Sequence, residues 1–279
     1  MKKGICAYCG RFKELTKEHI FPKFLYESLP EYDSMFFEKS KPKVRSYKEM
    51  FEPKIPDVCE DCNNNKLSRL DSYASKFIKK YCLKIVTSEP KKIFYNYNLL
   101  FRWLLKVSYN SARMCDNLSL LLEVHCPYIL TGLKEPDYIA ILAGLIKSSP
   151  LSLKEKMNLK EMGKRNGHLS DNGKKYILKI ADSGYFPHEF IRITNSYPVN
   201  INSYPGILPL KHIAIKSFSF LILDYTNKKI LDVFINDLGY VRLSSEGYAE
   251  IPFCAQDAIS SLTPHFLLHA REYKQQLKM

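Results

Sequence analysis

The chain has 279 residues, 46% of them hydrophobic, and its 42 Lys and Arg outnumber its 29 Asp and Glu to give a formal net charge of +13. This length suits one large core or two moderate ones, and the basic excess favours a polyanionic partner, either nucleic acid or anionic lipid. No apolar stretch approaches the roughly 20 residues of a membrane span and the first residues lack a signal-peptide hydrophobic region, so we expect a soluble, cytoplasmic protein without a membrane partner.

Two pairs of cysteines stand close together in the first quarter of the chain. Cys6 and Cys9 form one C-x-x-C motif, and Cys59 and Cys62 form another. In a reducing compartment, two such pairs predict a tetrahedral zinc site with four thiolate ligands, because each pair offers half of the coordination sphere. The other four cysteines are scattered among apolar residues and receive no function; they are Cys82, Cys115, Cys126 and Cys254.

Helical spacing follows the second cysteine pair. Apolar residues three or four apart predict a helix whose buried face holds Leu67, Leu70, Ala74, Phe77 and Tyr81. The segment 87–92 contains Pro90 and is the expected boundary between two domains, which we place at 1–86 and 87–279.

Beyond this boundary the pattern predicts a mixed helical and β-rich segment. Residues 98–114 and 136–149 are expected to form two buried helices, followed by an exposed connector at 154–175. Strand composition at 212–223, 230–235 and 240–243, separated by the turn sequences TNKK and NDLG, predicts an antiparallel meander. A final helix is expected within 255–278. The predicted fold class is α+β.

Two further motifs accompany the cysteine pairs. Glu18-His19-Ile20-Phe21-Pro22 comes nine residues after Cys9, and Asn63-Asn64-Asn65-Lys66 directly follows Cys62. With these motifs, residues 1–84 resemble the HNH endonuclease family, in the branch whose ββα-metal motif is clamped by a four-cysteine zinc site. The resemblance implies an N-terminal ββα-metal domain with a structural zinc ion, ahead of the mixed helical and antiparallel-β domain.

The resemblance also implies a role for each residue of these motifs. His19 matches the general base, Glu18 a neighbouring metal ligand, and Asn63 the ligand at the start of the helix. An imidazole suits the removal of a proton from the attacking water, and an oxygen-bound Mg²⁺ or Mn²⁺ suits the charge of the leaving oxygen. Lys66, one turn from Asn63, is expected to reach a phosphate of the substrate.

The chain departs from the family pattern at two places. No Asn stands in residues 54–58, where relatives carry one that braces the loop bearing the base, and Leu67 replaces a final His ligand. Asp71, one turn further along the helix, is a possible replacement metal ligand. The alternative is that Asp71 is an ordinary solvated carboxylate.

Between the base and the second cysteine pair lies a row of alternating basic residues, Lys39, Lys41, Lys43 and Arg45. In an extended segment all four point the same way and would follow a phosphate backbone. An edge strand protected by lysines from aggregation explains the same pattern equally well.

These observations predict a metal-dependent endonuclease that hydrolyses phosphodiester bonds of nucleic acid, with DNA as the favoured substrate. The resemblance suggests bacterial anti-phage defence as its setting, and the C-terminal segment is expected to select substrate or dock a partner. Two alternatives stay open. One is a nucleic-acid-binding or adaptor subunit whose catalysis has lapsed, and the other is a nuclease subunit that needs an ATPase partner.

Overall fold

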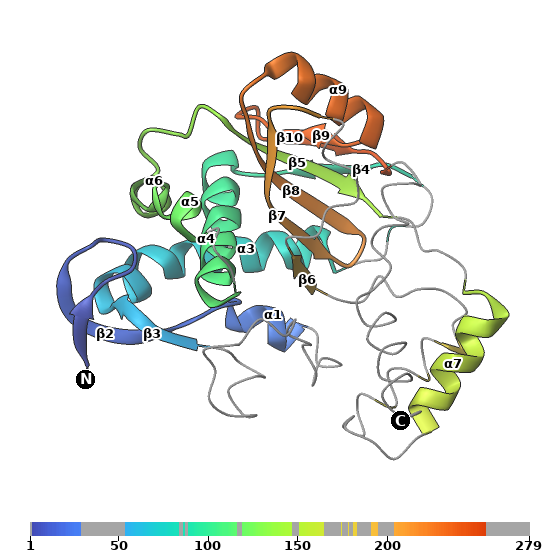
Figure 1. Ribbon diagram of the computed structural model, residues 1–279, viewed down its shortest axis with the longest axis horizontal. Coiled ribbons are helices and arrows are strands. Elements are labelled where there is room, and N and C mark those ends of the chain that lie inside the picture. Colours follow the sequence, from blue (N-terminus) through green and yellow to red (C-terminus); the bar gives the residue numbers. More distant parts are fainter. Residues whose placement is uncertain are drawn as a thin grey trace.

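The computed structural model describes residues 2–28, 54–83, 86, 89–115, 119–146, 151–164, 174, 178, 181–182, 191–194 and 204–254. These residues form a mixed fold of helices and antiparallel sheets, which confirms the predicted α+β class (Figure 1). Among the helices of these ranges, none combines the length and the apolar character needed to cross a membrane.

A small sheet and two consecutive helices begin the fold. Strands β1 (Lys3–Ile5), β2 (Phe12–His19) and β3 (Lys54–Cys59) pair antiparallel in the order β1-β2-β3, and α1 (Lys23–Ser28) follows β2. Directly after β3 the chain enters a π-helical segment, η1 (Asp61–Leu67), which continues as α3 (Ser68–Tyr81). The predicted helix is confirmed, since its five predicted core residues are all buried.

A long buried helix, α4 (Tyr97–Cys115), packs against α3 and confirms the helix predicted at 98–114. Short helices α5 (Ser119–Glu123) and α6 (Cys126–Thr131) also pack against α4, and α6 contacts η1 as well. Helix α4 is apolar over most of its surface, yet it also buries Lys106, Ser108, Asn110 and Ser111. Buried polar groups require hydrogen-bond partners, so this helix carries a polar network inside the core.

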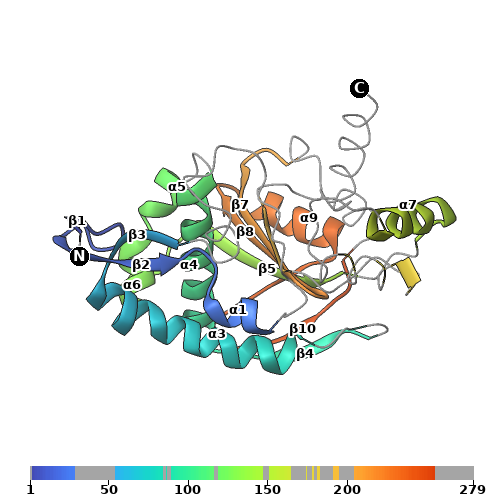
Figure 2. The same ribbon diagram turned by 90° about the horizontal axis from the view of Figure 1, so that it is seen from below.

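The central sheet has five strands in the order β6-β7-β8-β5-β9. These are β6 (Ile191–Thr194), β7 (Ile207–Ile215), β8 (Phe218–Tyr225), β5 (Ile139–Leu145) and β9 (Val241–Arg242). Helix α4 covers one face and α9 (Lys228–Leu238) the other, as Figures 1 and 2 show. A separate ribbon pairs β4 (Lys91–Phe94) with β10 (Tyr248–Ile251), and α7 (Leu153–Lys164) lies apart from the sheet.

The helix predicted at 136–149 is wrong, because this segment forms strand β5 in the middle of the sheet. Its odd-numbered residues pack into the core shared with α4, whereas Ala140 and Leu142 pack toward α9. A strand buried on both faces is apolar at every position and loses the alternation that identifies a half-buried strand. The exposed connector predicted at 154–175 is wrong in part, because helix α7 occupies its first half.

The predicted meander is also wrong in two respects. Residues 212–223 form a hairpin of two strands, which turns at Lys216 with a φ of 51° and at Ser217. Residues 230–235 belong to helix α9, which begins at the N-cap Asn227, whose side chain accepts backbone hydrogen bonds, and ends at Gly239 with a φ of 65°. The two turn sequences are therefore a helix start and a helix stop. The helix predicted within 255–278 lies outside the described residues.

One core cluster joins the two sides of the expected boundary at residue 86. It contains Leu70 and Phe77 of α3, Leu104 of α4, and Phe220 and Ile222 of the central sheet. The N-terminal sheet and α3 therefore share buried apolar contacts with the rest of the described chain.

Candidate functional site

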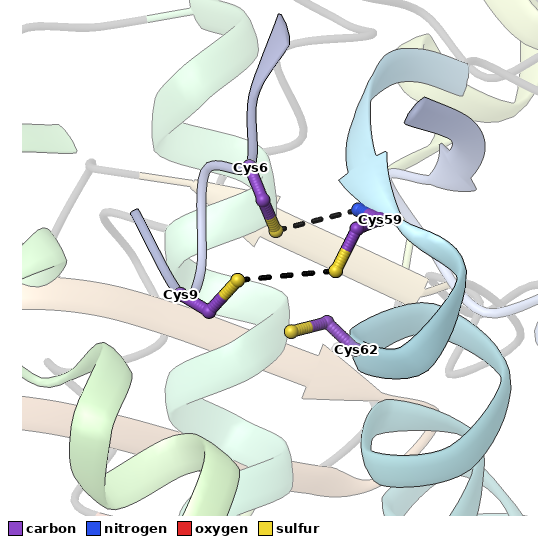
Figure 3. Close-up of side chains that lie close together, drawn as sticks. All are labelled: Cys6, Cys9, Cys59 and Cys62. Carbon is purple, nitrogen blue, oxygen red and sulfur yellow. Dashed lines mark hydrogen bonds between the residues drawn. The ribbon is translucent and has the colours of Figure 1, made fainter. Parts of the chain in front are cut away.

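Four cysteine thiols converge at one edge of the N-terminal sheet. Cys6 and Cys9 lie on the loop after β1, Cys59 ends β3, and Cys62 lies in η1 (Figure 3). The ligand atoms of the four residues all lie within 4.8 Å of one another, and the sulfur atoms of Cys9 and Cys59 are 3.8 Å apart. The predicted pairing of the two motifs into a single cluster is confirmed.

The backbone around the first cysteine pair favours metal binding. Gly10 adopts a φ of 66°, which lets the chain turn sharply enough for its N–H to donate to the carbonyl of Cys6. Burial acts to raise the pKa of Cys6, but backbone N–H groups of Cys59, Cys9 and Tyr8 donate to its sulfur and lower the pKa to about 7. Burial raises the pKa of Cys62 far above its usual value.

This donor set fits a thiophilic divalent ion. One thiol is already poised to ionise near neutral pH, and a bound cation would deprotonate the other three. Four sulfur donors, three of them buried, match the closed coordination of a structural zinc site. The cluster can therefore hold a metal ion such as zinc.

Glu18 lies inside the protein, near the end of β2. A bulge between Thr16 and Glu18 shifts the pairing of β2 with β3, and the Glu18 side chain is only 5% exposed. Its Oε1 atom lies 2.9 Å from Nζ of Lys106 and accepts a 3.2 Å hydrogen bond from Nδ2 of Asn110. The predicted metal ligand thus forms a buried ion pair with helix α4.

Asp71 binds the same ammonium group. Its Oδ2 is 2.6 Å from Nζ of Lys106, and its Oδ1 accepts a hydrogen bond from the indole N–H of Trp103. Burial opposes the charge of Lys106, but the carboxylates of Asp71 and Glu18 outweigh it and raise the pKa of Lys106. Lys106 is therefore charged at neutral pH, and Asp71 is a partly buried member of a triad with Lys106 and Glu18 rather than an ordinary solvated carboxylate.

His19 is the last residue of β2, where it pairs with Lys54 of β3. Its side chain is half-buried, with the Nε2 atom inside, and its backbone carbonyl accepts a 3.0 Å hydrogen bond from Asn110. The three residues that follow it are all buried: Ile20, Phe21 and Pro22. The chain therefore leaves the strand through a packed turn, which fixes where the imidazole can lie.

Asn63 lies beside the end of β2. Its Nδ2 donates to Oγ1 of Thr16 at 2.9 Å and to the carbonyl of Lys17 at 3.3 Å. The backbone here is π-helical, since the N–H of Ser68 donates to the carbonyl of Asn63. Single π-helical turns within helices are rare and are frequent at functional sites.

The structure brings some of the predicted site residues together. Asn63 contacts the strand that carries His19, whereas Glu18 is joined through Lys106 to Asp71. Lys66 forms an exposed ion pair with Asp61 at 3.4 Å. The predicted basic row, Lys39, Lys41, Lys43 and Arg45, lies outside the described residues.

Three residues of α4 that the sequence motifs did not predict complete this network. Lys106, Asn110 and Arg113 lie on one side of the helix, at spacing i, i+4 and i+7, and Arg113 forms an ion pair with Asp57 of β3. The available signal was this row of polar residues within an otherwise apolar helix. The spacing shows that the three share a face, but not which residues they meet.

The exposed face of α3 is basic. Arg69, Lys76, Lys79 and Lys80 are exposed, and the one acidic residue of this helix, Asp71, points inward to Lys106. By contrast, the sequences of α7 and α9 mix Lys with Asp or Glu. Helix α3 therefore presents charge of a single sign over about three turns, from Arg69 to Lys80.

Comparison of the chain with protein-family models, with curated proteins and with solved structures finds no match.

Proposed function

We propose that the protein is a zinc-stabilised endonuclease of the HNH type, with His19 as the general base. The main support is the way in which two segments of the chain lie against each other. The end of β2, which carries His19, lies against the start of the helical segment that carries Asn63. The four-thiol cluster joins the loop before β2 to the end of β3 and to the same helical segment. Two antiparallel strands followed by a helix with a cysteine cluster at their junction correspond to the ββα-metal order that the sequence implies.

In this proposal the half-buried imidazole of His19 takes a proton from the attacking water. The catalytic cation, Mg²⁺ or Mn²⁺, would neutralise charge on the leaving oxygen when bound. Asn63 would bind it through Oδ1, the atom opposite its donating Nδ2, and Glu18 would be the carboxylate ligand. A carboxylate offers about four lone-pair sites, so Glu18 has room for a cation besides Lys106 and Asn110.

A polyanionic substrate fits the charge of this region. The net charge of +13 is reinforced by the acid-free face of α3, and helix α3 runs away from the proposed site. Phosphate contacts made by Lys and Arg account for much of the affinity of nucleic-acid-binding proteins. We propose DNA as the substrate, held along α3 with the cleaved bond near His19.

Nicking of a supercoiled plasmid in the presence of Mg²⁺ or Mn²⁺ tests this function. We expect the wild type to nick, and His19→Ala to lose nicking while it retains one zinc ion per chain. The matched control is His125→Ala, since His125 lies at the start of α6. Nicking by His19→Ala at the wild-type rate would contradict the proposed role of His19.

The ion pair of Glu18 with Lys106 favours one alternative. If this carboxylate is fully engaged by the ammonium group, the chain is a nucleic-acid-binding adaptor in which catalysis has lapsed. Tight DNA binding by the wild type, without nicking under either metal ion, would show the adaptor function.

A further inference from the structure

The side chain of Asn110 connects helix α4 to Tyr8, Glu18 and His19 of the N-terminal segment. The residue lies on α4, outside the HNH-like segment, and its side chain is completely buried. Its Nδ2 donates to Oε1 of Glu18 at 3.2 Å and to the carbonyl of His19 at 3.0 Å. Its Oδ1 accepts hydrogen bonds of 2.6 Å from the hydroxyl of Tyr8 and from Nη2 of Arg113.

These four contacts use the full capacity of the amide, which has two donor protons and two acceptor lone pairs. They also determine its orientation. A guanidinium group has only donors, so Arg113 requires the Oδ1 side, whereas a backbone carbonyl such as that of His19 has only lone pairs and requires the Nδ2 side. A rotated amide would place donors against donors on one side.

The contact with His19 is made where the strand ends. Pairing between β2 and β3 runs to His19 and Lys54 and goes no further in the described ranges. The carbonyl of His19 is therefore held by a side chain from a distant helix, at a separation of 91 residues. Because Asn110 lies on a buried helix, this bond holds the peptide that follows the imidazole.

We propose that Asn110 is a positioning residue for His19, and that helix α4 is thereby part of the active site. This inference rests on the proposed function, in which His19 acts on the attacking water. Asn110 does not touch the reacting atoms. It acts by holding the backbone of His19 and the carboxylate of Glu18 in one arrangement.

Two substitutions test the proposal by removing the donated bonds in different ways. Asn110→Asp keeps the size of the side chain and the acceptor for Tyr8 and Arg113, but removes both donors. Asn110→Leu removes the donors without adding a charge. The control is Ser108→Ala, which removes another buried polar group from α4, one that donates to the carbonyl of Leu104.

Misplacement of a catalytic group by about 1 Å can lower a rate about 100-fold, so we expect a loss of kcat approaching this size in both Asn110 variants. KM and zinc content should stay close to the wild-type values. The NMR signals of the His19 ring, recorded without substrate, should shift in both variants and not in Ser108→Ala. Unchanged His19 signals together with unchanged kcat would overturn the proposal.

The NMR measurement separates this inference from the proposed function. If the wild type nicks no DNA but the His19 ring still shifts in both Asn110 variants, the nuclease function fails while the positioning of His19 stands. If the wild type and both variants nick equally well and the His19 ring signals do not shift, the nuclease stands and the positioning role fails.

A measurement on the unsubstituted protein covers the case in which the variants do not fold. Both side-chain amide protons of Asn110 should exchange slowly with solvent and show nuclear Overhauser contacts to His19. The exposed side chain of Asn236 provides the rapidly exchanging reference. Exchange of the Asn110 protons as fast as those of Asn236 would overturn the proposal.

Discussion

At the residue scale, the unusual feature is a fully buried ammonium group between two carboxylates. Lys106 has no exposed surface, and its partners Glu18 and Asp71 come from β2 and α3. A charge without water needs close partners, because the cost of removing it from solvent is several kcal/mol. The triad therefore joins α4 to both elements that carry the proposed site.

We expect Lys106→Met to destabilise the protein by about 3–5 kcal/mol, because it leaves two carboxylates without their buried counter-ion. Urea denaturation followed by circular dichroism measures the change. The matched control is Lys66→Met, which breaks an exposed ion pair with Asp61 and should change the free energy of unfolding very little. Equal losses in the two variants would contradict the structural role of Lys106.

The cysteine cluster could be predicted from spacing alone, and the buried network could not. Two C-x-x-C motifs restrict their own geometry, because each holds two ligands on one short turn. Asn110, in contrast, meets residues 91 and 92 positions away in the chain, and Lys106 meets Glu18 of β2 as well as Asp71 of α3. Nothing in the local sequence of α4 identifies Glu18 or His19 as their partners, since this depends on how the helix packs.

At the element scale, errors in the predicted secondary structure arose where two patterns look alike. Strand β5 is apolar at every position, as a buried helix of that length would be. Helix α9 contains β-branched and aromatic residues, which are typical of a strand. The residues at its two ends identify it as a helix instead. Asn227 accepts hydrogen bonds from the backbone N–H groups of Lys229 and Ile230, which satisfies the first turn of a helix.

We expect Asn227→Ala to cost about 1 kcal/mol of stability, because the first turn of α9 loses its side-chain cap. Asn236→Ala changes the same residue type on the last turn of this helix, where the side chain is exposed, and should be nearly neutral. Thermal and urea unfolding of both variants measure the difference. A loss in Asn236→Ala as large as that in Asn227→Ala would count against the capping role.

The basic face of α3 leads to a prediction about binding. Replacing Lys76 and Lys79 by Gln should weaken DNA binding and flatten its salt dependence, with the slope of log K against log salt reduced by about 0.9 for each phosphate that the variant no longer neutralises. Fluorescence anisotropy titrations at several salt concentrations measure both. The matched control replaces Lys160 and Lys164 of α7, which lie on a helix of mixed charge. Equal effects from the two helices would show that only net charge matters.

For the whole molecule, the four-cysteine cluster and the central sheet belong to one continuous core. Cys6, Cys59 and Cys62 are buried in the same cluster as Phe220 and Ile222 of β8. The packing around these cysteines is therefore continuous with the packing of the central sheet. Removal of a metal ion bound by these cysteines should therefore destabilise residues well beyond the N-terminal sheet.

We expect one zinc ion per chain and a single cooperative unfolding transition whose midpoint falls when zinc is chelated, because metal-binding energy in such sites is folding energy. Cys62→Ser should lose the zinc and show the same lower midpoint. Cys254→Ala, which changes a buried cysteine beside α9, should keep the zinc. Elemental analysis and calorimetry measure these properties. If calorimetry instead resolves two transitions and chelation moves only one, then 1–86 and 87–279 unfold as independent domains and the shared core does not couple them.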